Sequence, residues 1–205
     1  MTYYSLGGQD KWVLETLNFK TNGFFVDLGS GSGIKYSNTY TLENEYQWMG
    51  ICVEVNTDKF NELETNRTSI NINKAVYNYD GNCLIGDDGK INDESGTTVH
   101  CDTFNSILLN NPITNFIDYV SVNVGGKEFD VIKSIDFESN QIVLMSIQHN
   151  HYKVSYNNLD PIFYHMLDNG FERLVVNAVG EDPSDYYRYK QPYEDWYYNK
   201  KYINI

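Results

Sequence analysis

Ten consecutive residues near the N-terminus constrain the fold of this chain most strongly. Residues 24–33 read Phe-Phe-Val-Asp-Leu-Gly-Ser-Gly-Ser-Gly. A short apolar run that ends in a carboxylate and leads into a glycine-rich turn is typical of a buried parallel strand with a ligand at its carboxyl end. Glycine lets the backbone approach a ligand closely and adopt positive φ angles. We therefore expect a nucleotide-type ligand at the edge of a parallel sheet.

A second apolar strand that ends in a carboxylate follows about twenty residues after the glycine-rich turn. Residues 51–54 read Ile-Cys-Val-Glu, and a carboxylate at the position of Glu54 accepts hydrogen bonds from the hydroxyls of a ribose. Glycine at every second position of residues 29–33 is a tighter spacing than the G-x-G-x-x-G of dinucleotide sites. Together with Asp27 and Glu54, it is more similar to the S-adenosylmethionine loop of class I methyltransferases. A strand and turn that bind no ligand are the alternative interpretation.

Composition and charge limit the classes of fold and partner. The chain has 205 residues, of which 41% are hydrophobic and 21% are charged, and we expect one domain over residues 1–205. Its net charge of −13 opposes binding to phosphate backbones, so we expect no nucleic-acid partner. No apolar run approaches the ~20 residues that span a bilayer, and the N-terminus lacks the pattern of a signal peptide. We therefore expect no membrane partner and a cytoplasmic location.

The hydrophobic patterning predicts alternating strands and helices. Strands are expected at residues 23–28, 49–55, 70–77, 117–124, 142–148 and 171–179. Helices are expected at residues 5–19, within an N-terminal segment 1–22, and at 37–45, 57–66, 103–109, 127–134 and 160–167. Such alternation implies an α/β fold in which helices flank a mostly parallel central sheet with right-handed crossovers.

Two segments lack a clear helical or strand period. Residues 78–96 are rich in Gly, Asp and Asn, so we expect a hairpin or a mobile loop, and favour a plain solvated excursion. Residues 181–205 form an aromatic-rich C-terminal tail. This tail could pack over the sheet edge, stack on a sugar-like substrate or bury against another subunit of a homodimer, and packing is the favoured interpretation.

Several sequence blocks taken together resemble one family, the FkbM-type methyltransferases. The similar blocks lie at residues 5–10 (Ser-Leu-Gly-Gly-Gln-Asp), 25–29 (Phe-Val-Asp-Leu-Gly), 37–43, 50–54 and 60–67. The resemblance covers about residues 5–150. It implies a Rossmann-like class I methyltransferase fold of about seven strands that binds S-adenosylmethionine. It also implies methyl transfer to an oxygen, with a carbohydrate or a small molecule as the substrate.

The resemblance also implies roles for individual residues. The cofactor-binding residues would be Asp27, Gly29, Ser30, Gly31, Asn38 and Glu54. Of these, Asp27, Gly29 and Gly31 would surround the methionine part and Glu54 would bind the ribose. Asn38 and Glu43 would support the loop.

Three residues depart from the family pattern where the catalytic chemistry is expected. Asn123 stands where the family has Asp, and Gly125 and Gln148 stand where it has Glu. All three lie at the predicted carboxyl ends of strands. The amides of Asn123 and Gln148 cannot take up a proton and are poor ligands for a hard cation.

Two explanations of these departures remain open. In the first, the chain is an active O-methyltransferase whose catalytic residues are His149, Asn123 and Gln148, with His149 or the neighbouring His151 as the base. In the second, the chain is a catalytically inactive methyltransferase fold that serves as a binding or structural protein. A metal site at His149 and His151 is the weaker reading because no third ligand is evident.

Overall fold

The structure is a computed structural model, and it describes residues 2–87, 89–92, 94–150, 158–185 and 189–203. Among these residues, seven strands form one central sheet in the order β3-β2-β1-β7-β8-β10-β9. The strands are β1 (Phe24–Leu28), β2 (Met49–Val53), β3 (Ile70–Ile72), β7 (Phe116–Val122), β8 (Gln141–Gln148), β9 (Phe171–Val179) and β10 (Pro192–Asn199). The pairs β1–β2, β1–β7, β2–β3 and β7–β8 are parallel, whereas β10 is antiparallel to both its neighbours. This confirms the expected mostly parallel, Rossmann-like sheet.

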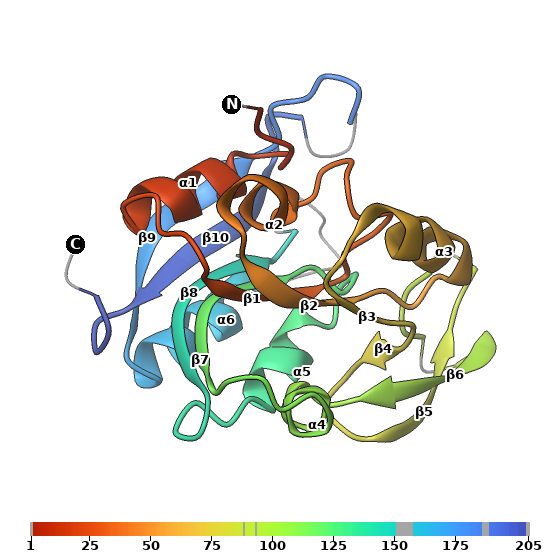
Figure 1. The fold of residues 1–205 in the computed structure, drawn as a ribbon. Coiled ribbons are helices and arrows are strands. Elements are labelled where there is room, and N and C mark those ends of the chain that lie inside the picture. Colours follow the sequence, from red (N-terminus) through yellow and green to blue (C-terminus); the bar gives the residue numbers. More distant parts are fainter. Residues whose placement is uncertain (1, 88, 93, 151–157, 186–188, 204–205) are drawn as a thin grey trace.

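Helices cover both faces of the sheet (Figure 1). On one face lie α1 (Gln9–Thr16), α2 (Tyr40–Tyr46) and α3 (Thr57–Asn66), and on the other α4 (Phe104–Asn110), α5 (Glu128–Lys133) and α6 (Leu159–Asp168). Side chains of β1 alternate between the two cores: Phe25 packs with Leu42 of α2, whereas Val26 and Leu28 pack on the opposite side. Because both faces are covered, the strand is apolar along most of its length, which is why its sequence signal is so clear.

Helix boundaries follow local capping chemistry. The side chains of Asn56 and Thr103 accept hydrogen bonds from the third residue of α3 and of α4, respectively. Helix α2 begins at residue 40, three residues later than expected, because the Thr39 hydroxyl donates to Asp27 Oδ2 at 2.7 Å. Helix α1 begins after Gly8, whose φ of +86° interrupts the expected longer helix.

The expected single strand at residues 70–77 is wrong. Its first half is β3, which pairs with β2, and its second half is β4 (Ala75–Val76), which pairs with β6 (Thr97–Asp102) in another sheet. The chain turns between them at Asn73, whose side-chain amide donates to the Glu54 and Val55 carbonyl oxygens. The apolar residues at 70–72 and at 75–76 therefore belong to two different sheets, and the sequence pattern does not show the turn between them.

A small second sheet occupies the segment expected to be a plain solvated excursion. In the described residues it has the order β4-β6-β5, and β5 (Gly81–Ile85) pairs antiparallel with β6. Cys83 and Cys101 are buried between its strands, with Ala75 beside them. The solvated excursion is therefore wrong, and the alternative hairpin is correct.

The aromatic C-terminal segment enters the central sheet instead of covering its edge. Strand β10 lies between β8 and β9, and its residues alternate between the two cores, with Trp196 on one side and Tyr197 on the other. The favoured packing over the edge is therefore wrong. Two consecutive acidic residues of this strand, Glu194 and Asp195, are buried. Because acidic residues normally face solvent, they make the sequence of this strand look unlike that of a buried strand. No helix in the described ranges is long and apolar enough to cross a membrane.

Candidate active site

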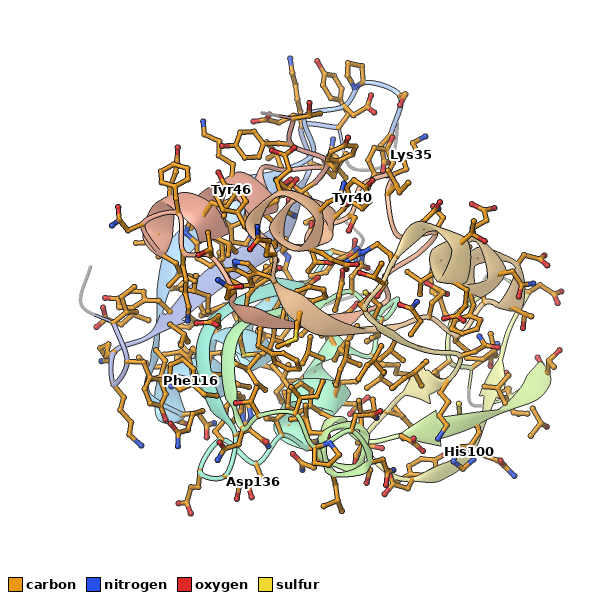
Figure 2. The ribbon with its side chains drawn as sticks, in the orientation of Figure 1. Lys35, Tyr40, Tyr46, His100, Phe116 and Asp136 are labelled. Atoms are coloured by element: carbon orange, nitrogen blue, oxygen red, sulfur yellow. The ribbon has the colours of Figure 1, made fainter. Side chains whose placement is uncertain are left out.

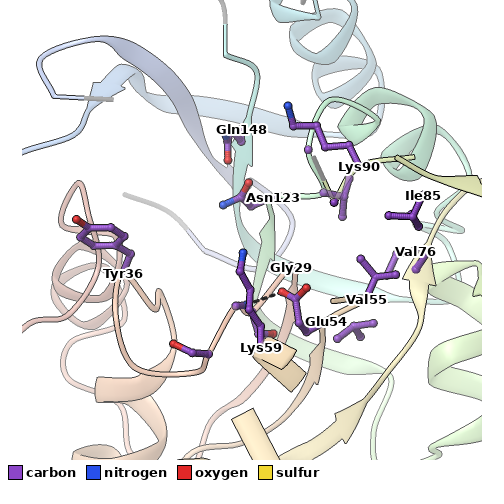
Figure 3. A pocket seen from close by; sticks show the side chains of 18 of the residues that line it. Gly29, Tyr36, Glu54, Val55, Lys59, Val76, Ile85, Lys90, Asn123 and Gln148 are labelled. Atoms are coloured by element: carbon purple, nitrogen blue, oxygen red, sulfur yellow. Dashed lines mark hydrogen bonds between the residues drawn. The ribbon is translucent and has the colours of Figure 1, made fainter. Parts of the chain in front are cut away.

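A cavity of about 670 Å³ opens at the carboxyl ends of β1, β2, β7 and β8 (Figure 3). In open α/β sheets, ligands bind at this edge, and the volume lies within the usual range of small-molecule sites. Residues expected at the site that line this cavity are Gly29, Ser30, Gly31, Glu54, Asn123 and Gln148. The other three predicted site residues, Asp27, Asn38 and His149, are not among its lining residues.

The glycine-rich loop is held against two neighbouring strand ends. The amides of Gly29 and Ser30 donate to the Val53 carbonyl oxygen at 2.8 and 3.1 Å. A Cβ at position 29 would lie 2.0 Å from the Asn123 carbonyl oxygen, so Gly29 is needed for contact between backbones. Gly31, with φ of +59°, has no described atom within 4 Å of such a Cβ position and borders the cavity. Within this loop, Gly31 is therefore the glycine that leaves space for a ligand.

Glu54 joins the second strand end to the glycine-rich loop. One carboxylate oxygen accepts from the Gly31 amide and the other from the Asn56 amide, each at 2.8 Å. The side chain is 7% exposed and lies on the cavity wall (Figure 3). Each carboxylate oxygen has two lone pairs, so both retain capacity to accept a hydroxyl. Glu54 is thus placed as the sequence pattern predicted.

Asp27 faces away from the cavity. It shares the side of β1 with Phe25, so its carboxylate lies beneath α2 and accepts from the Thr39 hydroxyl. Burial raises the pKa of Asp27 and outweighs the hydrogen bond from Thr39 and the nearby charge of Arg67. Asn38 is also buried, and it donates to the Ser121 hydroxyl at 3.0 Å. Asp27 and Asn38 therefore contact residues that lie behind the glycine-rich loop, outside the cavity.

Arg67 organises this region, and the sequence analysis assigned it no role. The Arg67 side chain is fully buried, and its guanidinium lies 2.7 Å from a carboxylate oxygen of Glu43. The guanidinium also donates to the Gly33 carbonyl oxygen and the Thr39 hydroxyl. It therefore connects the end of α3 to the loop and to α2. An arginine at the end of an amphipathic helix normally faces solvent, and only the tertiary fold shows that this one is buried. Glu43, expected to support the loop, bonds to Arg67 and to the backbone of Thr68 and Ser69.

Asn123 and Gln148 meet at the polar end of the cavity (Figure 3). The backbone amide of Asn123 donates to the Leu28 carbonyl oxygen, and this hydrogen bond holds Asn123 beside the end of β1. Gln148 Nε2 donates to Asn150 Oδ1 at 2.6 Å, while Gln148 Oε1 has no hydrogen-bond partner among the described residues. Gln148 is only 6% exposed, and a buried acceptor without a donor is costly. Gln148 Oε1 therefore has unused capacity to accept a hydrogen bond, but the atom is itself almost fully covered, so a ligand hydroxyl would reach it only after a small movement of the Gln148 side chain.

His149 lies behind the cavity wall. Its neighbours Gln148 and Asn150 line the cavity, whereas His149 Nε2 lies 3.4 Å from Asp195 Oδ1, with both side chains fully buried. Burial raises the pKa of Asp195, but hydrogen bonds from His149, the Asn177 amide and Arg173 outweigh it and hold this pKa below its ordinary value. This environment is that of a structural hydrogen bond. His151, the other expected base, lies outside the described residues.

The β5–β6 hairpin forms the apolar end of the cavity. Val55 and Val76 lie beside Ile85 of the hairpin (Figure 3), and Ile91, which forms a bridge with Ile85, also lines the cavity. Lys90, in the same hairpin, packs its side chain against Gly125. The sequence analysis named a hairpin as an alternative but gave it no role at the site, because its polar composition is that of a solvated loop. A flat apolar group and a polar group can therefore occupy the same cavity at opposite ends.

Solved structures with similar folds are methyltransferases. The N-terminal domain of human METTL16 matches with a TM-score of 0.50 at 11% identity, over 92% of this chain and 67% of that chain. Precorrin-6y C5,15-methyltransferase from Geobacter metallireducens matches with a TM-score of 0.51 at 13% identity, over 93% of this chain and 87% of that chain. The chain spans 65% of the length of the METTL16 methyltransferase domain. A comparison with curated proteins found no match.

The sheet order and the cavity at its edge define a Rossmann-like methyltransferase fold of class I. The family model of the methyltransferase FkbM domain matches residues 27–173, which is more than half of the chain, and the chain belongs to this S-adenosylmethionine-dependent family. The match ends before β10, so the strand that completes the sheet lies outside it.

The lining residues fit the family's cofactor. The Glu54 carboxylate would accept hydrogen bonds from the ribose hydroxyls beside the open space at Gly31. The apolar end formed by Val55, Val76 and Ile85 suits the flat face of an adenine. The cofactor of this chain is therefore S-adenosylmethionine.

Proposed function

We propose that the chain transfers a methyl group to a hydroxyl oxygen of a carbohydrate or another small molecule. The observation that carries this proposal is that Gln148, whose Oε1 has no hydrogen-bond partner among the described residues, lines the same cavity as Glu54 and the Gly29–Gly31 loop. A hydroxyl is the smallest common group that donates a hydrogen bond to this oxygen and also presents an oxygen to be methylated. The acidic net charge favours a small acceptor over a nucleic acid.

Bound S-adenosylmethionine supplies an activated methyl group. Glu54 would hold its ribose, and the backbone of Gly29, Ser30 and Gly31 would border its amino-acid part. The Asp27 carboxylate and Asn38 act from behind the wall, as positioning residues that keep the loop in place. We assign residues 1–205 to one domain for this activity.

Gln148 orients the acceptor hydroxyl in this proposal. Its Oε1 accepts the hydroxyl hydrogen bond, and its Nε2 is fixed by Asn150, so the amide has a defined direction. Asn123, at the end of β7, lies beside it on the same wall. Neither amide takes up the proton, which passes to water because an oxygen becomes strongly acidic as it is methylated. Alignment is therefore the main contribution of these residues to the rate.

Tyr36 provides an aromatic surface at the rim of the cavity. Its φ of +61° is uncommon for a large side chain, and its hydroxyl donates to Asp182 Oδ2 at 3.0 Å. A contact with Ser184 at 3.1 Å holds the ring from the same C-terminal segment. An aromatic ring fixed in this way suits the apolar face of a sugar, which supports a carbohydrate acceptor.

Calorimetric titration with S-adenosylhomocysteine, followed by methyl-transfer assays on a panel of sugars and small alcohols, tests this function. We expect binding of the nucleoside and methylation of at least one hydroxyl compound. An absence of binding removes the enzymatic function. Binding without transfer to any compound favours the alternative from the sequence, a methyltransferase fold that binds without catalysis, for which the described part of the structure offers no separate support.

A further inference from the structure

Lysine side chains gather at the cavity of a strongly acidic chain. The sequence contains 15 Lys and Arg residues against 28 Asp and Glu residues. Four lysines nevertheless line this cavity: Lys35, Lys59, Lys74 and Lys90. Lys74 is paired with Asp102 at 2.5 Å. The other lysines need a separate explanation.

Lys35 and Lys59 have no ion-pair partner among the described residues. Lys35 projects from the loop between β1 and α2 (Figure 2), and its ammonium lies 4.8 Å from the ring centre of Tyr36. Lys59 lies in the first turn of α3, and Figure 3 shows its side chain directed into the cavity. A cation in the first turn of a helix is disfavoured by the helix dipole. Both lysine side chains are exposed, so water solvates their charges and leaves them open to an anion that enters the cavity.

The acidic residues on the cavity wall do not neutralise these two lysines. Glu54 is hydrogen-bonded to the backbone amides of Gly31 and Asn56. Asp182, which does not line the cavity, is the acidic residue that interacts with Lys35: hydrogen bonds from Ser184 and Tyr36, and then the charge of Lys35, hold the pKa of Asp182 below its ordinary value. Glu62, one turn after Lys59 on α3, forms no ion pair with it within the described structure.

Charge on the rest of the chain argues for a small anion. A long polyanion must also contact the surface outside the cavity, and the net charge of −13 repels it there. A single phosphate, sulfate or carboxylate group that enters the cavity meets the lysines and avoids most of this repulsion. Lys and Arg side chains bind such groups through charge-assisted hydrogen bonds.

We infer that the methyl acceptor is a small hydroxylated anion, a compound bearing a phosphate, sulfate or carboxylate group, and that Lys35 and Lys59 bind that group. This inference rests on the proposed methyl transfer and specifies its substrate class. The unsatisfied Gln148 Oε1 then receives the acceptor hydroxyl, while the two lysines receive the charge. The carboxylate of the cofactor is the competing occupant of the lysines, and the experiment separates the two.

Inorganic phosphate is the probe, titrated into the full chain and followed by heteronuclear NMR with and without S-adenosylhomocysteine. We expect Lys35→Met and Lys59→Met each to raise the Kd for phosphate by about tenfold or more, as for a lost charged hydrogen bond. Lys201→Met is the matched control, because Lys201 also stacks on the following tyrosine, at 5.3 Å from the Tyr202 ring, but lies outside the cavity. We expect the control to bind phosphate as the unmodified chain does, and all three variants to bind S-adenosylhomocysteine with unchanged Kd.

Each contrary result has a distinct meaning. Absence of phosphate binding, or equal affinity in all variants, overturns the anion site. Weaker binding of S-adenosylhomocysteine with unchanged phosphate binding overturns it by assigning the lysines to the cofactor. Tighter, lysine-dependent binding of an RNA oligonucleotide overturns it in favour of a nucleic acid. Lysine-dependent phosphate binding without any binding of S-adenosylhomocysteine supports the anion site and removes the proposed methyl transfer.

Discussion

Lys90 packs against Gly125, and a Cβ at position 125 would lie 2.8 Å from the lysine Cγ. Position 125 is the place where the family pattern has Glu. The structure therefore connects this departure to the hairpin that closes the apolar end of the cavity. Restoring the glutamate would require Lys90 to move and residue 125 to keep a φ of +77°.

Alanine at position 125 should destabilise the fold more than alanine at position 89. Gly89 has the same φ of +77° but no described atom within 4 Å of its Cβ position, so it isolates the backbone strain of about 1–2 kcal/mol. Gly125→Ala adds displacement of Lys90, and urea unfolding should show a larger loss of stability. Removing the side chain with Lys90→Ala should recover the difference in a double-mutant cycle. Equal losses at the two glycines would contradict the packing.

Gly29→Ala and Gly31→Ala should differ sharply in stability. A Cβ at position 29 would lie 2.0 Å from the Asn123 carbonyl oxygen, which is fixed by its own strand, so we expect a loss of more than about 3 kcal/mol. At position 31 the space is open, and only the strain of positive φ remains, about 1–2 kcal/mol. Unfolding free energies from urea titrations measure both. If Gly31→Ala proved the more damaging, the assigned roles of the two glycines would be wrong.

Glu54→Gln and Asp27→Ala should separate cofactor binding from stability. Loss of the Glu54 charge should weaken the binding of S-adenosylhomocysteine by ~1.5–3 kcal/mol, measured by calorimetry, with little change in the free energy of unfolding. Glu64→Gln is the matched control: Glu64 is exposed on α3, the helix that follows Glu54, and this variant should bind normally. Asp27→Ala should lower stability, because it leaves the Thr39 hydroxyl and the nearby Arg67 without their buried carboxylate. Unchanged affinity in Glu54→Gln would place the ribose elsewhere.

Glu128 should make stability fall as pH rises towards neutrality. Burial raises the pKa of this side chain from 4.5 to about 7, against hydrogen bonds from the backbone amides of Gly126 and its neighbours. Between these values the unfolded chain has lost the proton while the folded chain retains it, so stability decreases with pH, by on the order of 3 kcal/mol. Above about pH 7 this dependence ends. Urea unfolding of the chain and of Glu128→Gln across this range measures it, and the same slope in both would exclude Glu128 as its origin.

Much of the site was evident from local sequence because it depends on strand ends. The apolar run before Gly29 and the carboxylate of Glu54 lie on adjacent parallel strands, whose carboxyl ends meet at one edge of the sheet. Position along the strand also fixes side-chain direction, and Asp27 alternates with Val26 and Leu28, which places it beneath α2. The expectation that Asp27 lines the ligand site did not take this alternation of side-chain direction into account.

By itself, the sequence determined the alternation of strands and helices, the glycine-rich turn and the two acidic strand ends, because each depends on residues close together in the chain. Only the tertiary structure decided that β10 inserts between β8 and β9, that Arg67 is buried beneath the loop and that Lys90 packs on Gly125. Those features depend on contacts between residues far apart in the chain. Charged side chains normally face solvent, and a local sequence pattern cannot show which of them the fold buries.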